Sequence, residues 1–259
     1  MPFANVHQQT LHYAHLQHDD KPHLILINSL GTNLLIWSQL ISLLSDQFQL
    51  LLHDKRGHGL SLLSQHQPTI DDYADDVIGL MDHCGISSAH VLGLSIGGLI
   101  TYSLASRYPD RCDKLIFSNT GAQIGTLEGW EERIEAIREG GLSGMGEGII
   151  QRWLSDSYAK NNPHAAKGYQ KMLEMTEQEG YMHACRAIGM ADFREAAKAI
   201  QHPSMFMVGS EDIGTTPDFV KEQAAMISGA RYHEISGVAH LPCLEAPEEV
   251  ALLIQQFLI

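Results

Sequence analysis

Hydrophobic and polar positions follow two alternating patterns along the first 121 residues. Short aliphatic runs, such as residues 23–31, are typical of strands that are buried on both faces. Segments with apolar residues three and four positions apart, such as residues 34–47, indicate amphipathic helices. Because strand and helix alternate several times, the pattern predicts an α/β fold with a mostly parallel sheet flanked by helices. Residues 4–17 alternate polar and apolar side chains and predict a hairpin ahead of the parallel strands.

The pattern changes after residue 121. The periodicity is then mostly helical, and strand and helix patterns return from residue 203 onward. We therefore expect a core formed by residues 1–121 and 200–259, with residues 122–199 inserted as a helical cap. The dense glycine stretch at 140–148 has no strand before it and no Lys-Ser or Lys-Thr after it. We interpret it as a flexible joint between cap helices rather than a phosphate-binding loop.

Composition places the chain among ordinary globular proteins, since 44% of its 259 residues are apolar and 19% are charged. No apolar run is long enough to cross a bilayer, and the first residues lack the basic and apolar regions of a signal peptide. The four cysteines have neither metal-ligand nor C-x-x-C spacing, which favours free thiols in a cytoplasmic protein. The sequence leaves the oligomeric state open.

The charge balance is strongly acidic, with 17 lysines and arginines against 31 aspartates and glutamates. The basic residues form no stripe, so we expect neither nucleic acid nor an anionic membrane surface as a partner. A small anionic substrate is compatible with this balance, because a single well-placed arginine can hold it.

Histidines are numerous, and five of the fifteen crowd the first 23 residues. A metal site among these five is one interpretation, but their spacing is irregular and no acidic or cysteine ligand keeps the same register. We therefore favour surface histidines on the hairpin, and we expect no metal and no cofactor. The five are His7, His12, His15, His18 and His23.

The most apolar stretch of the chain contains Ser95, where residues 93–97 fit the pattern G-x-S-x-G. An aliphatic run ends and a helical pattern begins at this serine. Such a sharp turn from strand to helix strains the middle residue and lifts its hydroxyl above the edge of the sheet. Gly93 and Gly97 fit because the backbone approaches too closely there for side chains, and Gly98 lets the helix pack against the sheet. Ser95 is therefore a candidate nucleophile.

A serine hydroxyl needs a base to remove its proton, and the expected base is a histidine that a carboxylate orients. His240 follows the last predicted strand, and Glu211 and Asp212 follow the strand before it. Because the carboxyl ends of parallel strands meet at one edge of a sheet, we expect these side chains to lie near Ser95.

The negative oxygen that develops in acyl transfer needs two hydrogen-bond donors, since removing one typically costs about 3 kcal/mol of barrier. We expect the first donor to be the backbone N–H of Ile96, at the start of the helix that follows Ser95. The second is expected from the loop NSLGTN (28–33) that follows the strand LILIN (24–28), where we assign the N–H of Leu30.

With these residues assigned, the chain resembles an α/β-hydrolase over nearly its whole length. The resemblance implies the α/β-hydrolase fold, no metal and no cofactor, and it favours Asp212 over Glu211 as the acid that orients His240. It rests on the segments NSLGTN (28–33), DKRGHGLS (54–61), GLSIGG (93–98), GSEDIGTTP (209–217) and GVAHLPCLEAPEEV (237–250).

Most members of that family have His-Gly where this chain has Asn28-Ser29. Together with the segments SNTGAQIGTLEGWEERI (118–134) and ACRAIGMADFREAAKAI (184–200), this departure resembles the 3-oxoadipate enol-lactonases of the β-ketoadipate pathway. The resemblance implies cytoplasmic hydrolysis of a small five-membered enol-lactone that carries a carboxylate side arm.

Such a carboxylate needs a cation, and arginine suits it because its planar fork matches the two oxygens. Arg133, three residues after Trp130 on a predicted cap helix, is the first candidate. Arg152, beside Trp153, is the second. The alternative for each arginine is a solvated charge on a helix. Trp130 is also expected to form a wall of the pocket.

Other functions stay open at this point. A general carboxylesterase, a cofactor-free perhydrolase and a carbon–carbon bond hydrolase would share the same triad, and the cap would distinguish them. A binding protein that kept the fold is an alternative of another class, although the complete set of Ser95, Asp212 and His240 argues against it. A haloalkane dehalogenase is disfavoured because its nucleophile would be an aspartate.

Overall fold

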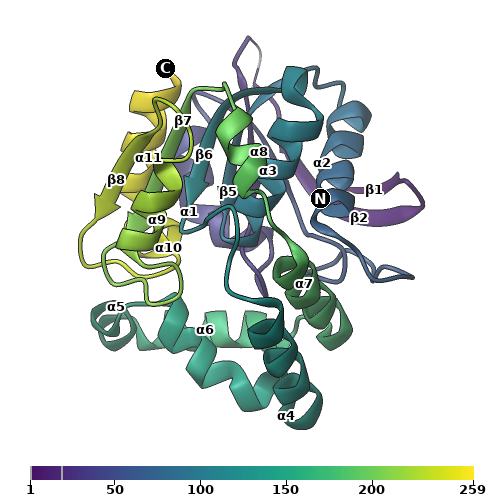
Figure 1. Cartoon of the computed structure of the whole chain (residues 1–259), viewed down its shortest axis with the longest axis vertical. Helices are drawn as coiled ribbons and strands as arrows, with labels where there is room; N and C mark the ends of the chain where they lie inside the picture. The colour runs from purple at the N-terminus through teal and green to yellow at the C-terminus, as the bar shows by residue number, and fades with distance from the viewer. Residues whose placement is uncertain (1, 19) are drawn as a thin grey trace.

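A sheet of eight strands forms the centre of the chain in the computed structural model, which describes residues 2–18 and 20–259 (Figure 1). The strands lie in the order β1-β2-β4-β3-β5-β6-β7-β8, in which β1–β2 and β2–β4 pair antiparallel and the other pairs are parallel. This arrangement confirms the predicted hairpin and the mostly parallel sheet. The strands are β1 (Phe3–Val6), β2 (Gln9–Leu16), β3 (His23–Ile27), β4 (Gln49–His53), β5 (Ala89–Leu94), β6 (Cys112–Ser118), β7 (Ser204–Gly209) and β8 (Arg231–Ile235).

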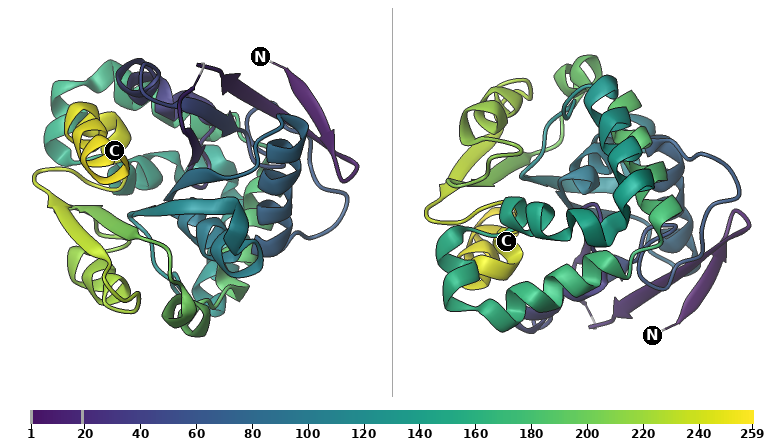
Figure 2. Two further views of the ribbon diagram at one scale, coloured as in Figure 1. Left: turned by 90° about the horizontal axis from the view of Figure 1, so that it is seen from above. Right: turned by 90° about the horizontal axis from the view of Figure 1, so that it is seen from below.

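Helices cover both faces of the sheet (Figure 2). α1 packs beside α11 on one face, and α2 packs beside α3 on the other. α3 directly follows β5 and is buried at 10 of its 12 positions, so it is an internal helix without a polar face. These elements are η1 (Leu34–Trp37), α1 (Ser38–Leu44), α2 (Ile70–His83), α3 (Ile96–Arg107), η2 (Pro109–Arg111), α9 (Pro217–Ala224), α10 (Pro242–Glu245) and α11 (Pro247–Leu258).

Local signals explain where several helices begin. The hydroxyl of Thr69 accepts a hydrogen bond from the N–H of Asp72, and the Asp72 carboxylate accepts one from the N–H of Thr69, so a capping box starts α2. The hydroxyl of Thr216 caps α9 in a similar way by accepting from the N–H of Phe219. Pro217 occupies the first position of α9, where its missing N–H costs nothing.

The segment between β6 and β7 is helical in the described structure, as the periodicity predicts. Its first helices lie below the sheet in Figure 1, whereas α8 lies beside α3. Gly141 interrupts α4 with a non-helical backbone (φ 68°, ψ 171°), so two helical pieces join within the expected glycine stretch. The division into a core and a cap at residues 122–199 stays a prediction. The helices are α4 (Leu127–Trp153), α5 (Asp156–Asn161), α6 (Pro163–Glu174), α7 (Gln178–Met190) and α8 (Arg194–Ala199).

The expectation of surface histidines on the hairpin is wrong for His12. This side chain is buried, and its Nδ1 lies 2.7 Å from Oδ2 of Asp54. The reason is that other groups cover this face of β2: the ring lies against Asp54 in the turn after β4 and 5.2 Å from the ring of Phe3, and the Ser61 hydroxyl accepts from the N–H of His12. Within the described residues, no group of three or more His, Cys, Asp or Glu side chains is placed to hold a metal ion.

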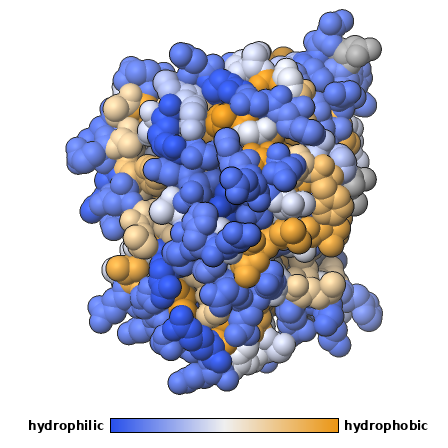
Figure 3. Space-filling model, turned by 90° about the vertical axis from the view of Figure 1, so that its right-hand side faces the viewer, coloured by the Kyte–Doolittle hydropathy of each residue, from blue (hydrophilic) through white to orange (hydrophobic). Residues whose placement is uncertain are grey.

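The face at the right of Figure 1 is mostly hydrophilic, with separate groups of apolar side chains (Figure 3). None of the helices in the described part of the chain combines the length and the apolar character that a bilayer span requires.

Candidate active site

Ser95 lies at the turn where β5 passes into α3. Its backbone has φ 59° and ψ −116°, a conformation that residues other than glycine rarely adopt, so the predicted strain is confirmed. A Cβ atom on Gly93 would lie 2.1 Å from the carbonyl oxygen of Gly97, and one on Gly97 would lie 2.2 Å from the carbonyl oxygen of Ile27. Both glycines are therefore required by close backbone approach, as predicted.

Hydrogen bonds between this turn and the end of the neighbouring strand β6 hold Ser95 in place. The N–H of Ser95 donates to the carbonyl oxygen of Ser118 at 2.9 Å, and the hydroxyl of Thr120 donates to the carbonyl oxygen of Ser95 at 2.7 Å. A Cβ atom on Gly98 would lie 2.2 Å from the Thr120 side chain, so this glycine allows α3 to approach the sheet. The end of β6 thus fixes the position of the serine.

Asp212 and His240 form a buried pair on the loops that follow β7 and β8. Oδ2 of Asp212 lies 2.7 Å from Nδ1 of His240, and the Asp212 side chain is fully buried. Burial alone would raise the pKa of Asp212, but the charge of His240 and hydrogen bonds from three side chains outweigh it and lower the pKa to about 2. The carboxylate is therefore held ionised next to the imidazole.

Two further side chains, which sequence reasoning missed, bind the same carboxylate. The Asn119 amide donates to Oδ2 of Asp212 at 2.8 Å, and the Thr215 hydroxyl donates to the same oxygen at 2.7 Å. Oδ1 accepts from the backbone N–H groups of Gly214 and Thr215. The only signal for Asn119 in the sequence is its position directly after β6, at the edge of the sheet where the site lies.

The loop that carries His240 is tied to the end of α4. The N–H of Leu241 donates to the carbonyl oxygen of Trp153 at 3.1 Å. The Glu245 carboxylate accepts from the N–H of Ala239 at 2.9 Å and from the hydroxyl of Ser155. The histidine loop and the helical segment between β6 and β7 are therefore positioned together.

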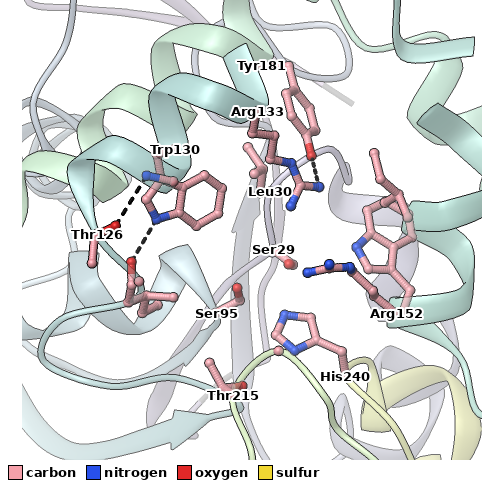
Figure 4. Close-up of a pocket in the computed structure, with 16 residues that line it drawn as sticks. Ser29, Leu30, Ser95, Thr126, Trp130, Arg133, Arg152, Tyr181, Thr215 and His240 are labelled. Carbon is pink, nitrogen blue, oxygen red and sulfur yellow. Dashed lines mark hydrogen bonds between the residues drawn. The ribbon is translucent and has the colours of Figure 1, made fainter. Parts of the chain in front are cut away.

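A cavity of 390 Å³ opens in front of Ser95 and His240, which lie at one end of it (Figure 4). Asp212 does not reach this cavity, because it lies behind His240. The side chain of Ile96 is also buried away from it, but its N–H is the first of α3 and has no acceptor within the helix. Of the residues singled out in the sequence, the cavity is lined by Ser95, His240, Leu30, Trp130, Arg133, Arg152 and Trp153.

Two arginines face this cavity from α4. Nη2 of Arg133 donates to the hydroxyl of Tyr181 at 2.6 Å, and the guanidinium lies 5.5 Å from the ring of Trp130 and 5.7 Å from the ring of Tyr181. Within the described residues, neither Arg133 nor Arg152 forms an ion pair, and Glu131 on the same helix binds Arg186 instead. The cavity thus combines a serine and a histidine with unpaired positive charge.

Comparison with known proteins identifies the family of this chain. Residues 22–247 match the family model described as alpha/beta hydrolase fold. The chain belongs to the α/β-hydrolase family. It is 35% identical to 3-oxoadipate enol-lactonase 2 of Acinetobacter baylyi over 80% of this chain and 77% of that one. It is 30% identical to 3-oxoadipate enol-lactonase 1 of the same organism, over 92% and 89% of the two chains.

This α/β-hydrolase is also similar to a solved structure, the enol-lactonase from Burkholderia xenovorans LB400. The two have a TM-score of 0.96 and 34% sequence identity, and 99% of each chain is covered. The predicted α/β-hydrolase fold is thereby confirmed, and the chain is a hydrolase. The individual roles of Ser95, Asp212, His240, Leu30 and Ile96 stay predictions.

Proposed function

We propose that this α/β-hydrolase opens 3-oxoadipate enol-lactone to 3-oxoadipate through an acyl-serine intermediate on Ser95. The proposal places the enzyme in the degradation of aromatic compounds by the β-ketoadipate pathway. It also places the enzyme in the cytoplasm, a location supported by four cysteines that are all free thiols. The substrate is a small carboxylated lactone, and neither nucleic acid nor a membrane takes part.

One observation carries the proposal: a single cavity holds Ser95, the His240 that Asp212 binds, and two arginines without an ion pair among the described residues. An ester hydrolase for neutral substrates needs the first three residues but has no use for the arginines. A lactone with a carboxylate side arm uses all five, because the carboxylate is the missing partner of Arg133 or Arg152.

The first chemical step is the attack of Ser95 on the lactone carbonyl. His240 takes the proton from the hydroxyl as the oxygen bonds to carbon. The N–H groups of Leu30 and Ile96 hold the negative oxygen of the tetrahedral intermediate. When this intermediate collapses, the ring C–O bond breaks and His240 returns the proton to the leaving enolate oxygen, which stays attached to the same carbon chain.

The second step removes the acyl group from Ser95. His240 takes a proton from a water molecule, the resulting hydroxide attacks the acyl carbon, and the serine oxygen leaves with that proton. The enol then converts to the ketone, which draws the overall reaction forward. Throughout, Asp212 keeps the imidazole in the orientation in which its Nε2 faces the serine, and it stabilises the positive charge of the protonated ring.

The proposal is tested by following the loss of enol-lactone absorbance and, separately, the hydrolysis of p-nitrophenyl acetate. We expect kcat/KM for the lactone to exceed that for the simple ester. Ser95→Ala should abolish both activities while the variant still binds the product. A preference for the simple ester would make the chain a general carboxylesterase. Equal activity of wild type and Ser95→Ala would reject the acyl-serine mechanism and favour a binding protein.

A further inference from the structure

Lys55 is a fully buried lysine that the mechanism above does not use. It follows β4 by two positions, in the turn that packs against the end of β3. Its Nζ donates hydrogen bonds to the carbonyl oxygens of Asn28 at 3.0 Å and Ser29 at 2.9 Å. Both carbonyls belong to the loop that precedes Leu30, the residue assigned to the oxyanion hole.

The burial of this ammonium group is costly, and no carboxylate offsets it directly. The neighbouring Asp54 accepts hydrogen bonds from His12, Leu34 and Leu60, and Lys55 forms no ion pair within the described residues. Moving a charge from water into the protein without such a partner is unfavourable, because the interior does not replace the lost hydration. An apolar side chain of the same length would stabilise the fold better, so this lysine calls for a functional explanation.

The geometry of one peptide bond supplies that explanation. The carbonyl of Ser29 and the N–H of Leu30 belong to the same planar trans peptide, so they point in opposite directions. Lys55 and the hydroxyl of Thr32, at 2.8 Å, hold the carbonyl. In the part of the chain that the structure describes, the N–H of Leu30 has no acceptor, and Leu30 lines the cavity with Ser95.

We propose that Lys55 is a positioning residue for the oxyanion hole: by holding the carbonyl oxygens of Asn28 and Ser29, it fixes the peptide that aims the N–H of Leu30 at the reacting carbonyl. The ammonium also polarises this peptide, because positive charge at the carbonyl oxygen strengthens its N–H as a donor. This inference rests on the proposed acyl-serine mechanism. It adds a residue that touches neither substrate nor reacting atoms.

The test compares Lys55→Met with Lys114→Met. Lys114 is a matched control, because its Nζ also donates to two backbone carbonyls, those of Phe257 and Leu258, but it lies on the first half of β6, away from the cavity. Two measurements need no knowledge of the natural substrate. One is the acylation rate with p-nitrophenyl acetate, and the other is inhibition by phenylboronic acid, which forms a tetrahedral adduct with an active serine.

In Lys55→Met we expect acylation to be roughly 10- to 100-fold slower with little change in KM, because losing one oxyanion donor outright costs about 100-fold or more. The inhibition constant of phenylboronic acid should rise by a similar factor. Lys55→Gln keeps a neutral N–H donor group in place of the charged one, so its acylation rate and inhibition constant should fall between those of wild type and Lys55→Met. It also replaces Lys55→Met in the test if that variant does not fold. Lys114→Met should match the wild type in both measurements.

The proposal is overturned if a folded Lys55 variant keeps the wild-type acylation rate and boronate affinity. It is also overturned if Lys55→Met and Lys114→Met show the same changes in kcat and KM. Failure of the acyl-serine mechanism has a separate signature. In that case Ser95→Ala would hydrolyse the ester as fast as wild type, and phenylboronic acid would inhibit neither protein.

Discussion

The side-chain amide of Asn119 donates a 2.8 Å hydrogen bond to Oδ2 of Asp212, the same oxygen that binds Nδ1 of His240. Asn119 reaches this position from the end of β6 with a positive φ of 49°, a conformation that asparagine tolerates better than most residues. With the Thr215 hydroxyl, three side chains converge on one carboxylate oxygen. They hold the pKa of Asp212 near 2, against the effect of its burial.

Asn119→Gly should weaken this site while keeping the backbone conformation, because glycine accepts a positive φ. Hydrogen bonds to charged groups contribute about 1.5–3 kcal/mol, so we expect kcat/KM to fall by roughly tenfold or more. Thr215→Val removes one donor to the same oxygen and is the matched variant. A kcat/KM unchanged in Asn119→Gly would mean that the amide does not help to orient the Asp212–His240 pair.

The same bond predicts how stability depends on pH. The pKa of Asp212 is depressed in the folded chain, so its ionised form stabilises the fold above about pH 4, and this contribution is lost as the pH falls from about 4 to 2. Asn119→Gly should raise the pKa of Asp212 and so reduce that loss. Urea unfolding at pH 5.5 and pH 3 should therefore give a smaller drop for the variant than for wild type. Equal drops would contradict the assigned cause of the shift.

The strained backbone of Ser95 is expected to lower the free energy of unfolding of the chain. Residues in such sparsely populated conformations store about 1–3 kcal/mol, which glycine would release. We expect the unfolding free energy of Ser95→Gly to exceed that of Ser95→Ala by about 1 kcal/mol, after the extra entropy of glycine in the unfolded chain is counted. Ser95→Gly should therefore also unfold at a higher temperature. Both variants lack the hydroxyl, so the comparison isolates the backbone. Identical stabilities would show that the turn is unstrained.

Much of this site could be predicted from local patterns. The turn at Ser95 is encoded by a strand, a serine and a helix with glycines at fixed positions, all within ten residues. Asp212 and His240 could be placed because each follows a strand of a parallel sheet, and such strands end at a common edge. These inferences use only the spacing of hydrophobic positions and the direction in which the chain runs along each strand.

The remaining partners depend on contacts that no local pattern encodes. Tyr181 binds Arg133 from a helix 48 positions further along the chain. The burial of His12 follows from contact with Asp54 and Ser61 in the turn after β4, which is more than 40 residues away in the sequence. Lys55 sits in a glycine-rich turn, a context that ordinarily indicates exposure, and only the packing of β4 against β3 brings it under the loop at Asn28.

Arg133 predicts a difference between charged and neutral substrates. Arg133→Met keeps the apolar stem against Trp130 and Tyr181 but removes the charge. Because a charge-assisted hydrogen bond contributes about 1.5–3 kcal/mol, KM for the carboxylated lactone should rise roughly 10- to 100-fold, with kcat changed much less. KM for p-nitrophenyl acetate should stay close to wild type.

Arg152→Met is the matched variant for this experiment, since Arg152 lines the same cavity but is exposed and makes no hydrogen bond within the described residues. A larger effect on the lactone KM in Arg152→Met would transfer the carboxylate-binding role to that residue. Equal effects of Arg133→Met on the charged and the neutral substrate would reject an electrostatic role for Arg133.

The buried position of Lys55 predicts a second dependence of stability on pH, in the alkaline range. Burial lowers the pKa of Lys55 to about 7, although the charge of Asp54 opposes this shift. Burial lowers the pKa of His53 and of His58, and the positive charge of Lys55 lowers both further. Both imidazoles are therefore neutral neighbours of Lys55. An unfolded chain would keep the ordinary lysine pKa of 10.5.

Below about pH 7, Lys55 is protonated in both the folded and the unfolded chain, and the penalty for burying its charge is fully present. Between about pH 7 and 10.5 the unfolded chain binds a proton that the folded chain lacks, so stability rises with pH by up to about 1.4 kcal/mol per pH unit. The difference in unfolding free energy between wild type and Lys55→Met, measured with urea, should therefore shift in favour of wild type from pH 7 to pH 9.5. Other titrating groups are common to both proteins and cancel in this difference. A difference independent of pH would mean that Lys55 keeps its full charge when folded, in which case polarisation of the Ser29–Leu30 peptide would persist in alkaline solution as well.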